Sequence, residues 1–360
     1  MNNKRLLENL MVQEILQAAS LSVVLFIGVF CFLSHNVEGQ VLDTEKSLQT
    51  KTQNFKSLQI AYLTDASFSD AGWGAFAYNA GLELMSKYNH NVTLQDNVTI
   101  PDIEKTVRSY ANKNFDIIIT QGFEWGDPVL NVAKDYPDTK FIVFTGLVKS
   151  KNVASIFPKQ QDAAFILGAL ATMLSKNQTI GFIGGDEKYP NLRHIYEGYR
   201  QGAQYINPKT KVLETYLQDW DNETKGRSAA LSQIAHGADI LLHVADTSGK
   251  GVIDAAKEKG IYAFGAVSDQ NKLAPDTVVT SFVLDPQKAY DSVFAMIHAN
   301  NFTGDIFSPG LESFKNSTTE EGIVYIAPFH GFEEKIPAEI QTKLHEISRD
   351  IVNKKIIVAE

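Results

Sequence analysis

The stretch "DIIITQGFEWGDPVLNVAK", residues 116–134, decides the fold class. Its first part is an unbroken apolar run typical of a buried strand, and its second part has the spacing of a helix. A second stretch, "DILLHVADTSGKGVIDAAK" at residues 239–257, aligns with it without a gap. Each copy is followed by a further apolar strand, "KFIVFTG" and "IYAFGAV". The repeat predicts two similar α/β lobes, and convergence on a common strand–loop–helix pattern is the alternative.

The same alternation of strand and helix patterns fills the chain after residue 57. The apolar runs "LQIAYLT", "TIGFIGG" and "KVLETYL" each precede a helical pattern of ordinary length. Strands separated in this way indicate βαβ units and parallel sheets. Because the strands are apolar almost throughout, helices are expected on both faces of each sheet. The sequence therefore predicts an α/β fold of two Rossmann-like lobes, lobe 1 at residues 58–157 and lobe 2 at residues 158–284.

The N-terminal residues form a separate region. Residues 15–34 carry no charge and contain "LSVVLFIGVFCFL", long enough to cross a hydrocarbon core. Lys4 and Arg5 precede this run, which indicates a cytoplasmic N-terminus and an extracytoplasmic globular part. We predict a single-span membrane anchor at residues 1–34 and a polar tether at residues 35–57. A cleaved signal peptide is the alternative.

Composition excludes several classes of function. The net charge of −9 does not suit a protein that neutralises nucleic-acid phosphates, so no nucleic-acid partner is expected. The single cysteine, Cys31, lies in the N-terminal apolar run, which leaves no thiol for catalysis, disulfides or zinc binding in the globular part. No nucleotide-binding loop, nucleophile elbow or metal-ligand spacing is present. We expect no catalytic residues, metal or cofactor, so an enzyme such as a nucleoside hydrolase is a remote alternative.

The candidate ligand site lies in the loops that follow the predicted strands. In open parallel sheets, ligands bind at the carboxyl ends of the strands. These loops carry all three tryptophans and many aspartates, a combination suited to stacking on a flat heterocycle and hydrogen bonding to its edge. The alternative is structural: tryptophans covering the sheet ends, and aspartates capping helices. The candidate ligand-binding residues are Asp65, Phe68, Ser69, Asp70, Trp73, Phe123, Glu124, Trp125, Asp127, Trp220, Asp246, Thr247 and Asp269.

A series of motifs along the globular part resembles the BMP family, the PnrA-like substrate-binding proteins of ABC transporters. It includes "YLTDASFSDAGW", "GFIGGDEKYPNLRHIYEGYRQGAQYINP", "ADILLHVADTSGKGVIDAAKEKGIYAFGAVSDQNKLAP" and "IAPFHGFEEKIP". The resemblance implies a type I periplasmic-binding-protein fold, with residues 285–322 returning to lobe 1 and residues 323–360 belonging to lobe 2. It also implies ABC permease and ATPase partners, and a purine nucleoside or nucleobase as ligand.

The resemblance further implies roles for individual residues. Phe68 matches the stacking Phe of the family's first loop, and Trp220 stands where a ring stacks from the other lobe. Departures from the nucleoside-binding pattern are Val267 in place of Asp, Leu284 in place of Lys and Ser69 in place of Asn. Because these polar groups are expected to serve the sugar or the edge of the base, their loss favours a nucleobase or another heterocycle. A ligand sensor without a transport role is the alternative function.

Overall fold

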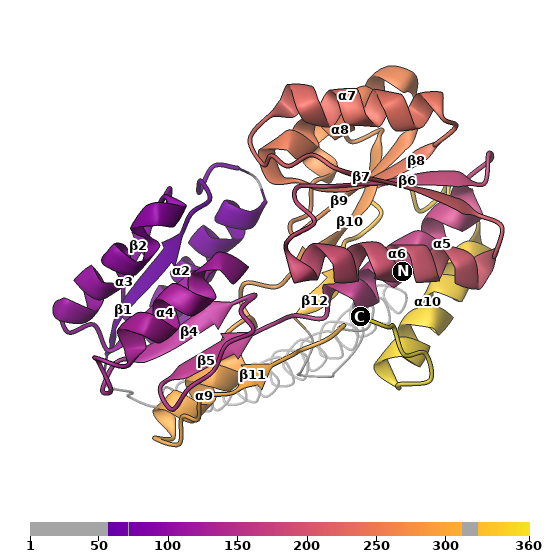
Figure 1. Cartoon of the computed structure of the whole chain (residues 1–360). Helices are drawn as coiled ribbons and strands as arrows, with labels where there is room; N and C mark the ends of the chain where they lie inside the picture. Colours follow the sequence, from indigo (N-terminus) through magenta and orange to yellow (C-terminus); the bar gives the residue numbers. More distant parts are fainter. Residues whose placement is uncertain (1–56, 71, 312–322) are drawn as a thin grey trace, which may run out of the picture. The chain divides into compact units, whose positions relative to one another are not determined.

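The described part of the chain contains two six-stranded sheets (Figure 1). A computed structural model describes residues 57–70, 72–311 and 323–360. The first sheet has the order β11-β5-β4-β3-β1-β2, and the second has the order β12-β10-β9-β8-β6-β7. All neighbouring strands are parallel except β12, which runs antiparallel to β10. The strands are β1 (Gln59–Thr64), β2 (Asn91–Gln95), β3 (Ile117–Gln121), β4 (Lys140–Phe144), β5 (Val153–Ile156), β6 (Thr179–Gly184), β7 (Lys211–Tyr216), β8 (Ile240–Val244), β9 (Tyr262–Gly265), β10 (Val278–Leu284), β11 (Ile306–Phe307) and β12 (Val324–Ile326).

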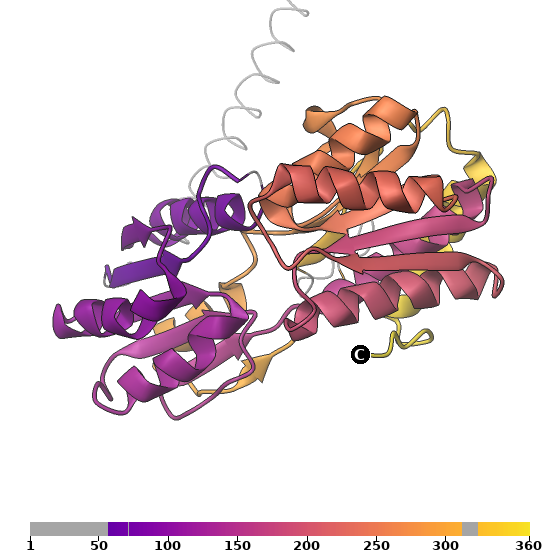
Figure 2. The ribbon, with the colours of Figure 1, turned by 45° about the horizontal axis from the view of Figure 1, so that its top comes forward.

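Helices cover these sheets, and we call each sheet with its helices a lobe. The first lobe carries α2 (Trp73–Tyr88), α3 (Ile103–Asn112), α4 (Gly126–Ala133) and α9 (Asp291–His298). The second carries α5 (Gln160–Leu174), α6 (Pro190–Ile206), α7 (Glu223–Ala235), α8 (Asp246–Lys259) and α10 (Ala338–Val352). In Figures 1 and 2, α7 and α8 lie on one face of the second sheet while α5 and α6 lie on the other. Short 3₁₀ turns occur at Ile100–Asp102, Phe123–Trp125 and Asn271–Leu273.

The two sheet orders explain the internal repeat in the sequence. The copy at residues 116–134 forms β3 and α4, and the copy at residues 239–257 forms β8 and most of α8. Both β3 and β8 occupy the fourth place in their sheet orders. The prediction of two similar parallel α/β lobes is therefore confirmed.

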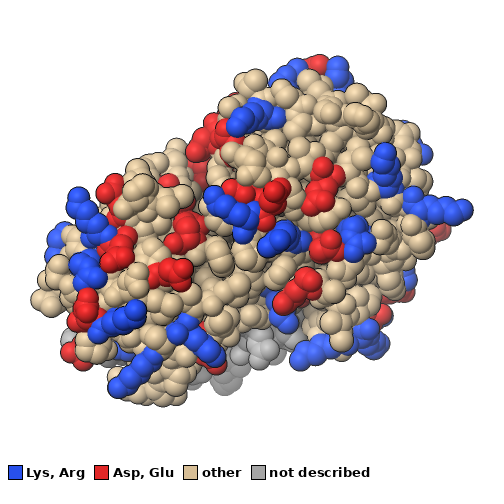
Figure 3. All heavy atoms as spheres, viewed as in Figure 1, with Lys and Arg blue, Asp and Glu red and all other residues tan. Residues whose placement is uncertain are grey.

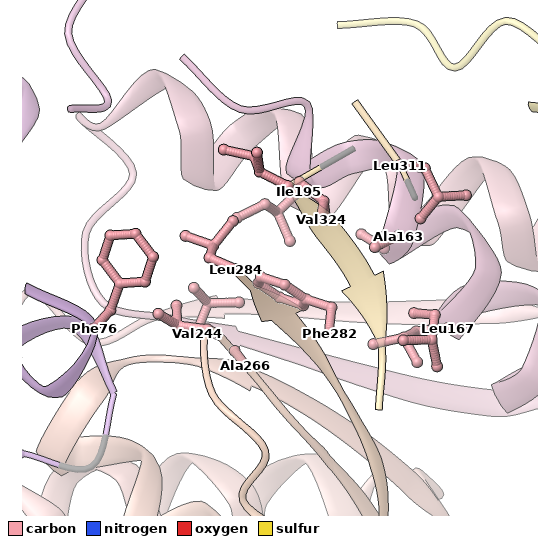
Figure 4. Close-up of a cluster of buried hydrophobic side chains, with 14 of the residues drawn as sticks. Phe76, Ala163, Leu167, Ile195, Val244, Ala266, Phe282, Leu284, Leu311 and Val324 are labelled. Atoms are coloured by element: carbon pink, nitrogen blue, oxygen red, sulfur yellow. The ribbon is translucent and has the colours of Figure 1, made fainter. Parts of the chain in front are cut away.

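The core follows from the alternation of side chains along each strand. In β1, Ile60 and Tyr62 face the cluster that contains Phe76 of α2, whereas Ala61 and Leu63 face the cluster under α3 and α4. The first of these clusters continues without interruption into the second lobe. Figure 4 shows part of it, where side chains from β8, β10 and β12 meet those of α5 and α6.

Charged side chains of both signs are interspersed over the face shown in Figure 3. Most of the ion pairs join partly exposed groups, such as Lys87 with Asp291 and Arg108 with Asp135. Exposed pairs of this kind contribute little to stability, so the fold depends mainly on its apolar clusters.

The predicted membrane anchor at residues 1–34 and almost all of the predicted tether fall outside the described residues. Within residues 57–70, 72–311 and 323–360, none of the helices has both the length and the apolar character needed to cross a bilayer.

Candidate functional site

A cavity of about 130 Å³ lies where strand ends of both sheets meet. In each sheet the contributing loops follow the carboxyl ends of parallel strands, the usual place for ligands in such folds. From the first lobe the lining residues are Asp65, Ala66, Ser67, Asp70, Trp73, Gly122, Phe123, Glu124 and Thr145. From the second lobe they are Gln160, Tyr189, Asn191, Leu192, Trp220, Asp221, Val244, Asp246 and Val267.

Aromatic rings reach this cavity from both lobes. Trp73, the first residue of α2, lies nearly parallel to Phe76, with ring centroids 6.2 Å apart. Trp220 meets the edge of Tyr189 with centroids 5.6 Å apart. A Cβ atom at Gly185 would lie 2.3 Å from the Trp220 ring, so glycine is what allows the indole to rest on the backbone there. Rings from opposite lobes are therefore available to stack on a planar molecule.

The Trp73 side of the cavity is fixed by a buried hydrogen-bond chain. Tyr290, just before α9, shares a 2.6 Å hydrogen bond with Tyr62 of β1. The Tyr62 hydroxyl donates to Gln121 Oε1 at 2.6 Å, and Gln121 Nε2 donates to the Trp73 carbonyl at 2.7 Å. Since Tyr62 and Tyr290 are fully buried polar groups, each depends on this pairing. The chain links three elements of the first lobe to the start of α2.

Asp70 combines a place in the lining with a structural task. Its carboxylate accepts hydrogen bonds from the amides of Gly72 and Gly74, both at 2.7 Å, and from Ala75 at 3.1 Å. Asp70 therefore satisfies amides at the start of α2, as the helix-capping alternative requires, although the N-cap residue itself is Gly72. Asp70 is only 5% exposed.

Two further carboxyl groups, Asp65 and Glu124, face each other in the first lobe. Burial, followed by the negative charge of Asp65, raises the pKa of Glu124 to about 8. Burial also raises the pKa of Asp65, opposed by its interaction with Glu124. The nearby Trp125 indole favours the charged form of Asp65, although Asp65 Oδ1 and Trp125 Nε1 make no hydrogen bond within the described residues. At neutral pH the Glu124 carboxyl group therefore favours its protonated form.

Asp246 brings a carboxyl group from the second lobe to the start of α2. A Cβ atom at Gly72 would lie 3.5 Å from Asp246 Oδ1, which shows how closely the two lobes approach. Burial, then the charges of Asp70, Asp65 and Asp221, raises the pKa of Asp246 well above its ordinary value. The Trp73 amide opposes this shift, as expected at a helix N-terminus.

The backbone at the cavity is strained at three residues with left-handed φ angles. They are Thr145 at 59°, Asp246 at 43° and Val267 at 68°. Such angles are unfavourable for β-branched residues like Thr145 and Val267, and strain of this kind concentrates at functional sites. All three line the cavity.

The structure separates the predicted ligand-binding residues into two groups. Those that line the cavity are Asp65, Asp70, Trp73, Phe123, Glu124, Trp220 and Asp246; those outside the lining are Phe68, Ser69, Trp125, Asp127, Thr247 and Asp269. Among the second group, Phe68 packs against Tyr78 of α2 with ring centroids 5.5 Å apart. Trp125 is fully buried in the cluster under α3 and α4. Of the three rings expected to enclose the solute, Trp73 and Trp220 line the cavity and Phe68 does not.

The remaining residues of the second group have other surroundings. Ser69 is exposed and pairs with Ser67, and Asp127 is an exposed residue in the first turn of α4. Thr247 lies in the first turn of α8, next to Asp246. Asp269 accepts a hydrogen bond from His330 at 2.5 Å. These four side chains therefore lie outside the lining of the cavity.

Several lining residues were missed by sequence reasoning. Tyr189 stands in the loop "GGDEKYP", so the rule that selected strand-end aromatics would have found it. Gln160 and Asn191 are polar residues at the starts of α5 and α6, and nothing in the sequence distinguishes them from ordinary helix termini. In the described ranges, no group of three or more His, Cys, Asp or Glu side chains is arranged to hold a metal ion.

Comparison with known proteins agrees with this architecture. The family model described as "ABC transporter substrate-binding protein PnrA-like" matches residues 57–358. The chain is 28% identical over 247 residues to the transcriptional activator protein med of Bacillus subtilis, covering 68% of this chain and 77% of that protein. It is 29% identical over 231 residues to a purine-binding protein of Brucella abortus, covering 63% and 65% of the two chains.

A solved structure shows the same fold. The crystal structure of an ABC transporter solute-binding protein from Aeropyrum pernix K1 superposes with a TM-score of 0.73 at 20% identity. The match covers 84% of this chain and 94% of that one. At this level of identity, the likeness concerns the fold alone.

Proposed function

Because the chain belongs to the family of PnrA-like ABC transporter substrate-binding proteins, we propose that it captures a purine nucleobase or nucleoside outside the cytoplasm for import. The uncharged run at residues 15–34 supports a membrane tether that keeps the binder close to its permease. The ABC permease and ATPase subunits are the proposed partners.

The observation that carries this proposal is the cavity lined by rings and carboxyl groups of both lobes. Trp73 comes from the first lobe, and Tyr189 and Trp220 come from the second. A solute that contacts both lobes stabilises their closed arrangement by its differential affinity for that state. A transporter can then distinguish the loaded protein from the empty one.

The size and lining of the cavity favour a nucleobase over a nucleoside. A cavity of about 130 Å³ leaves less room for a base joined to a sugar than for the base alone. At the positions where the nucleoside-binding pattern has Asp and Lys, this chain has Val267, an apolar residue of the lining, and Leu284, which is buried in the core. Neither can pair with a ribose hydroxyl, and a buried unpaired hydroxyl costs about 1–3 kcal/mol. The purine-binding relative supports the purine ring itself.

The second candidate function is ligand sensing without transport. The sensing function is favoured by the sequence similarity to a transcriptional activator, because the matched region covers 77% of that activator. In this case closure of the two lobes around the solute would change an interaction with a signalling partner. The same change between open and closed lobes can serve transport or signalling.

Calorimetric titration of the purified full-length chain tests the proposed ligand. Adenine, guanine and hypoxanthine are expected to bind, and their ribosides are expected to bind more weakly. Absence of binding by every purine would contradict the proposal. Uptake of labelled purine by cells with and without the gene then separates transport from sensing, because a sensor would leave the uptake rate unchanged.

A further inference from the structure

Asparagine is followed two residues later by threonine more often in this chain than its composition explains. With 22 asparagines, 22 serines and 22 threonines, chance placement would give about three Asn-x-Ser/Thr triplets. The chain has six, all with threonine, and all lie beyond residue 57 in the part predicted to be extracytoplasmic. Such triplets, without proline at the centre, are the acceptor sequences for N-linked sugars. The asparagines of these acceptor triplets are Asn91, Asn97, Asn177, Asn222, Asn301 and Asn316.

The structure distinguishes two of the acceptor triplets from the others that it describes. In the triplets that begin at Asn91 and Asn301, the asparagine and the threonine, Thr93 or Thr303, are both exposed. Within the described residues, none of these four side chains makes a hydrogen bond. The acceptor amide and the hydroxyl of each triplet are therefore open to an enzyme. Asn316 lies outside the described residues.

The central residue of each of these two triplets is anchored to the core. Asn91 is the first residue of β2, the edge strand of the first sheet. Because alternate residues of a strand share a face, Asn91 and Thr93 are presented together while Val92 packs against the apolar core. Phe302 packs against the same core at the centre of the second triplet. Both triplets are thus held on the surface by the side chain between the asparagine and the threonine.

In each of the other three described triplets, one of the groups that the enzyme needs is already engaged. The Asn177 amide donates to a backbone carbonyl at 3.1 Å. The Asn222 side-chain oxygen accepts a backbone amide of α7 at 3.1 Å and caps that helix. After Asn97, the Thr99 hydroxyl donates to Asp102 at 2.7 Å. These triplets serve as internal comparisons within the same chain.

The two open triplets lie at the same end of the first lobe. The Nε2 atoms of His90 and His298 are 3.2 Å apart. His90 directly precedes Asn91, and His298, the last residue of α9, stands three residues before Asn301. Because Asn91 begins β2, this is the end where the parallel strands start, whereas the cavity lies at their carboxyl ends. Sugars attached here would leave the cavity open.

We propose that Asn91 and Asn301 carry N-linked glycans. The donor is an oligosaccharide joined to a membrane lipid through pyrophosphate. The asparagine Nδ2 atom forms a bond to the anomeric carbon of the first sugar as the bond from that carbon to the pyrophosphate oxygen breaks. The lipid pyrophosphate leaves, and one amide proton passes to a base of the transferase. This inference rests on the proposed function only in that the globular part lies outside the cytoplasm.

Peptide mapping by mass spectrometry tests the modification. The full-length chain is purified from the membranes of cells that naturally produce it. Peptides with Asn91 and Asn301 are expected to carry the mass of an oligosaccharide, whereas those with Asn177 and Asn222 are expected to be unmodified. In the same cells, Asn91→Gln and Thr93→Ala should each remove the glycan at residue 91, because the enzyme needs both groups, and Thr93→Ser should retain it. Asn177→Gln is the matched control and should leave the mass of every glycan unchanged.

Unmodified peptides at both Asn91 and Asn301 would overturn the inference and leave a purine-binding function intact. Modification of Asn177 and Asn222 to the same extent would also overturn it, because the structure would then not select the sites. Removing both glycans by the Asn91→Gln, Asn301→Gln double variant should change the dissociation constant for hypoxanthine by less than about twofold. If no purine binds a chain that carries both glycans, the proposed ligand fails while this inference stands.

Discussion

Replacement of Trp220 by alanine is predicted to weaken solute binding far more than replacement of Phe68. Trp220 lines the cavity and is held there by the edge of Tyr189 and the backbone of Gly185. A stacking partner contributes about 0.5–1.5 kcal/mol beyond area burial. One ring face of roughly 50 Å² adds about 1.3 kcal/mol at about 25 cal/mol per Å². Together these terms amount to about 2–3 kcal/mol, which corresponds to a loss of affinity of about 20- to 100-fold.

Phe68→Ala is the matched comparison, because Phe68 also lies in a strand-end loop but packs against Tyr78, outside the cavity lining. We expect its dissociation constant for the same purine to stay within about threefold of wild type, because the loop remains anchored by Asp70 and by the bond from the Phe68 amide to Asp96. The assay is titration calorimetry at fixed pH and salt. A large loss in Phe68→Ala with little change in Trp220→Ala would refute the assignment of rings made here.

Three predictions concern buried groups and are measured by urea unfolding. Burial raises the pKa of Glu124 to about 8 in the folded protein, so the stability that this group contributes falls as the pH rises from its unfolded pKa toward 8. The Glu124→Gln variant should therefore have a free energy of unfolding at pH 8 that is about 1–2 kcal/mol higher than that of the wild type. A lower free energy of unfolding in the variant would contradict this reasoning. Tyr290→Phe removes the bond to Tyr62 and should cost about 1–2 kcal/mol, whereas an unchanged midpoint would show that the buried chain is dispensable. Burial lowers the pKa of His243 to about 4, so the free energy of unfolding decreases by about 1.4 kcal/mol per pH unit as the pH falls below about 6.5. The His243→Gln variant should lack this contribution to the pH dependence of stability. The same pH dependence in the variant and the wild type would show that His243 does not cause it.

The sequence was most informative where the chain's own pattern decides the structure. Continuous apolar runs such as that of β3 could be assigned to buried parallel strands, and the match between residues 116–134 and 239–257 predicted two related sheets. The loops that carry Trp73 and Trp220 followed from the rule that ligands bind at strand ends. These inferences need only local pattern and the geometry of parallel sheets.

Side-chain direction within the loops could not be predicted in this way. Phe123 and Trp125 are two residues apart in one 3₁₀ turn, and that turn directs Phe123 to the cavity while Trp125 enters the core. Phe68 lies in a loop whose backbone is held by hydrogen bonds to Asp70 and Asp96. In this loop conformation the Phe68 ring packs against Tyr78. Such outcomes depend on tertiary contacts that the sequence does not state.

The central claim is that one planar solute is held between the strand ends of the two lobes. A crystal structure of the full-length chain grown with hypoxanthine tests it most directly. We predict electron density for the base between Trp73 on one side and Trp220 on the other. Density for the base at any other place, with this cavity holding only solvent, would contradict the account.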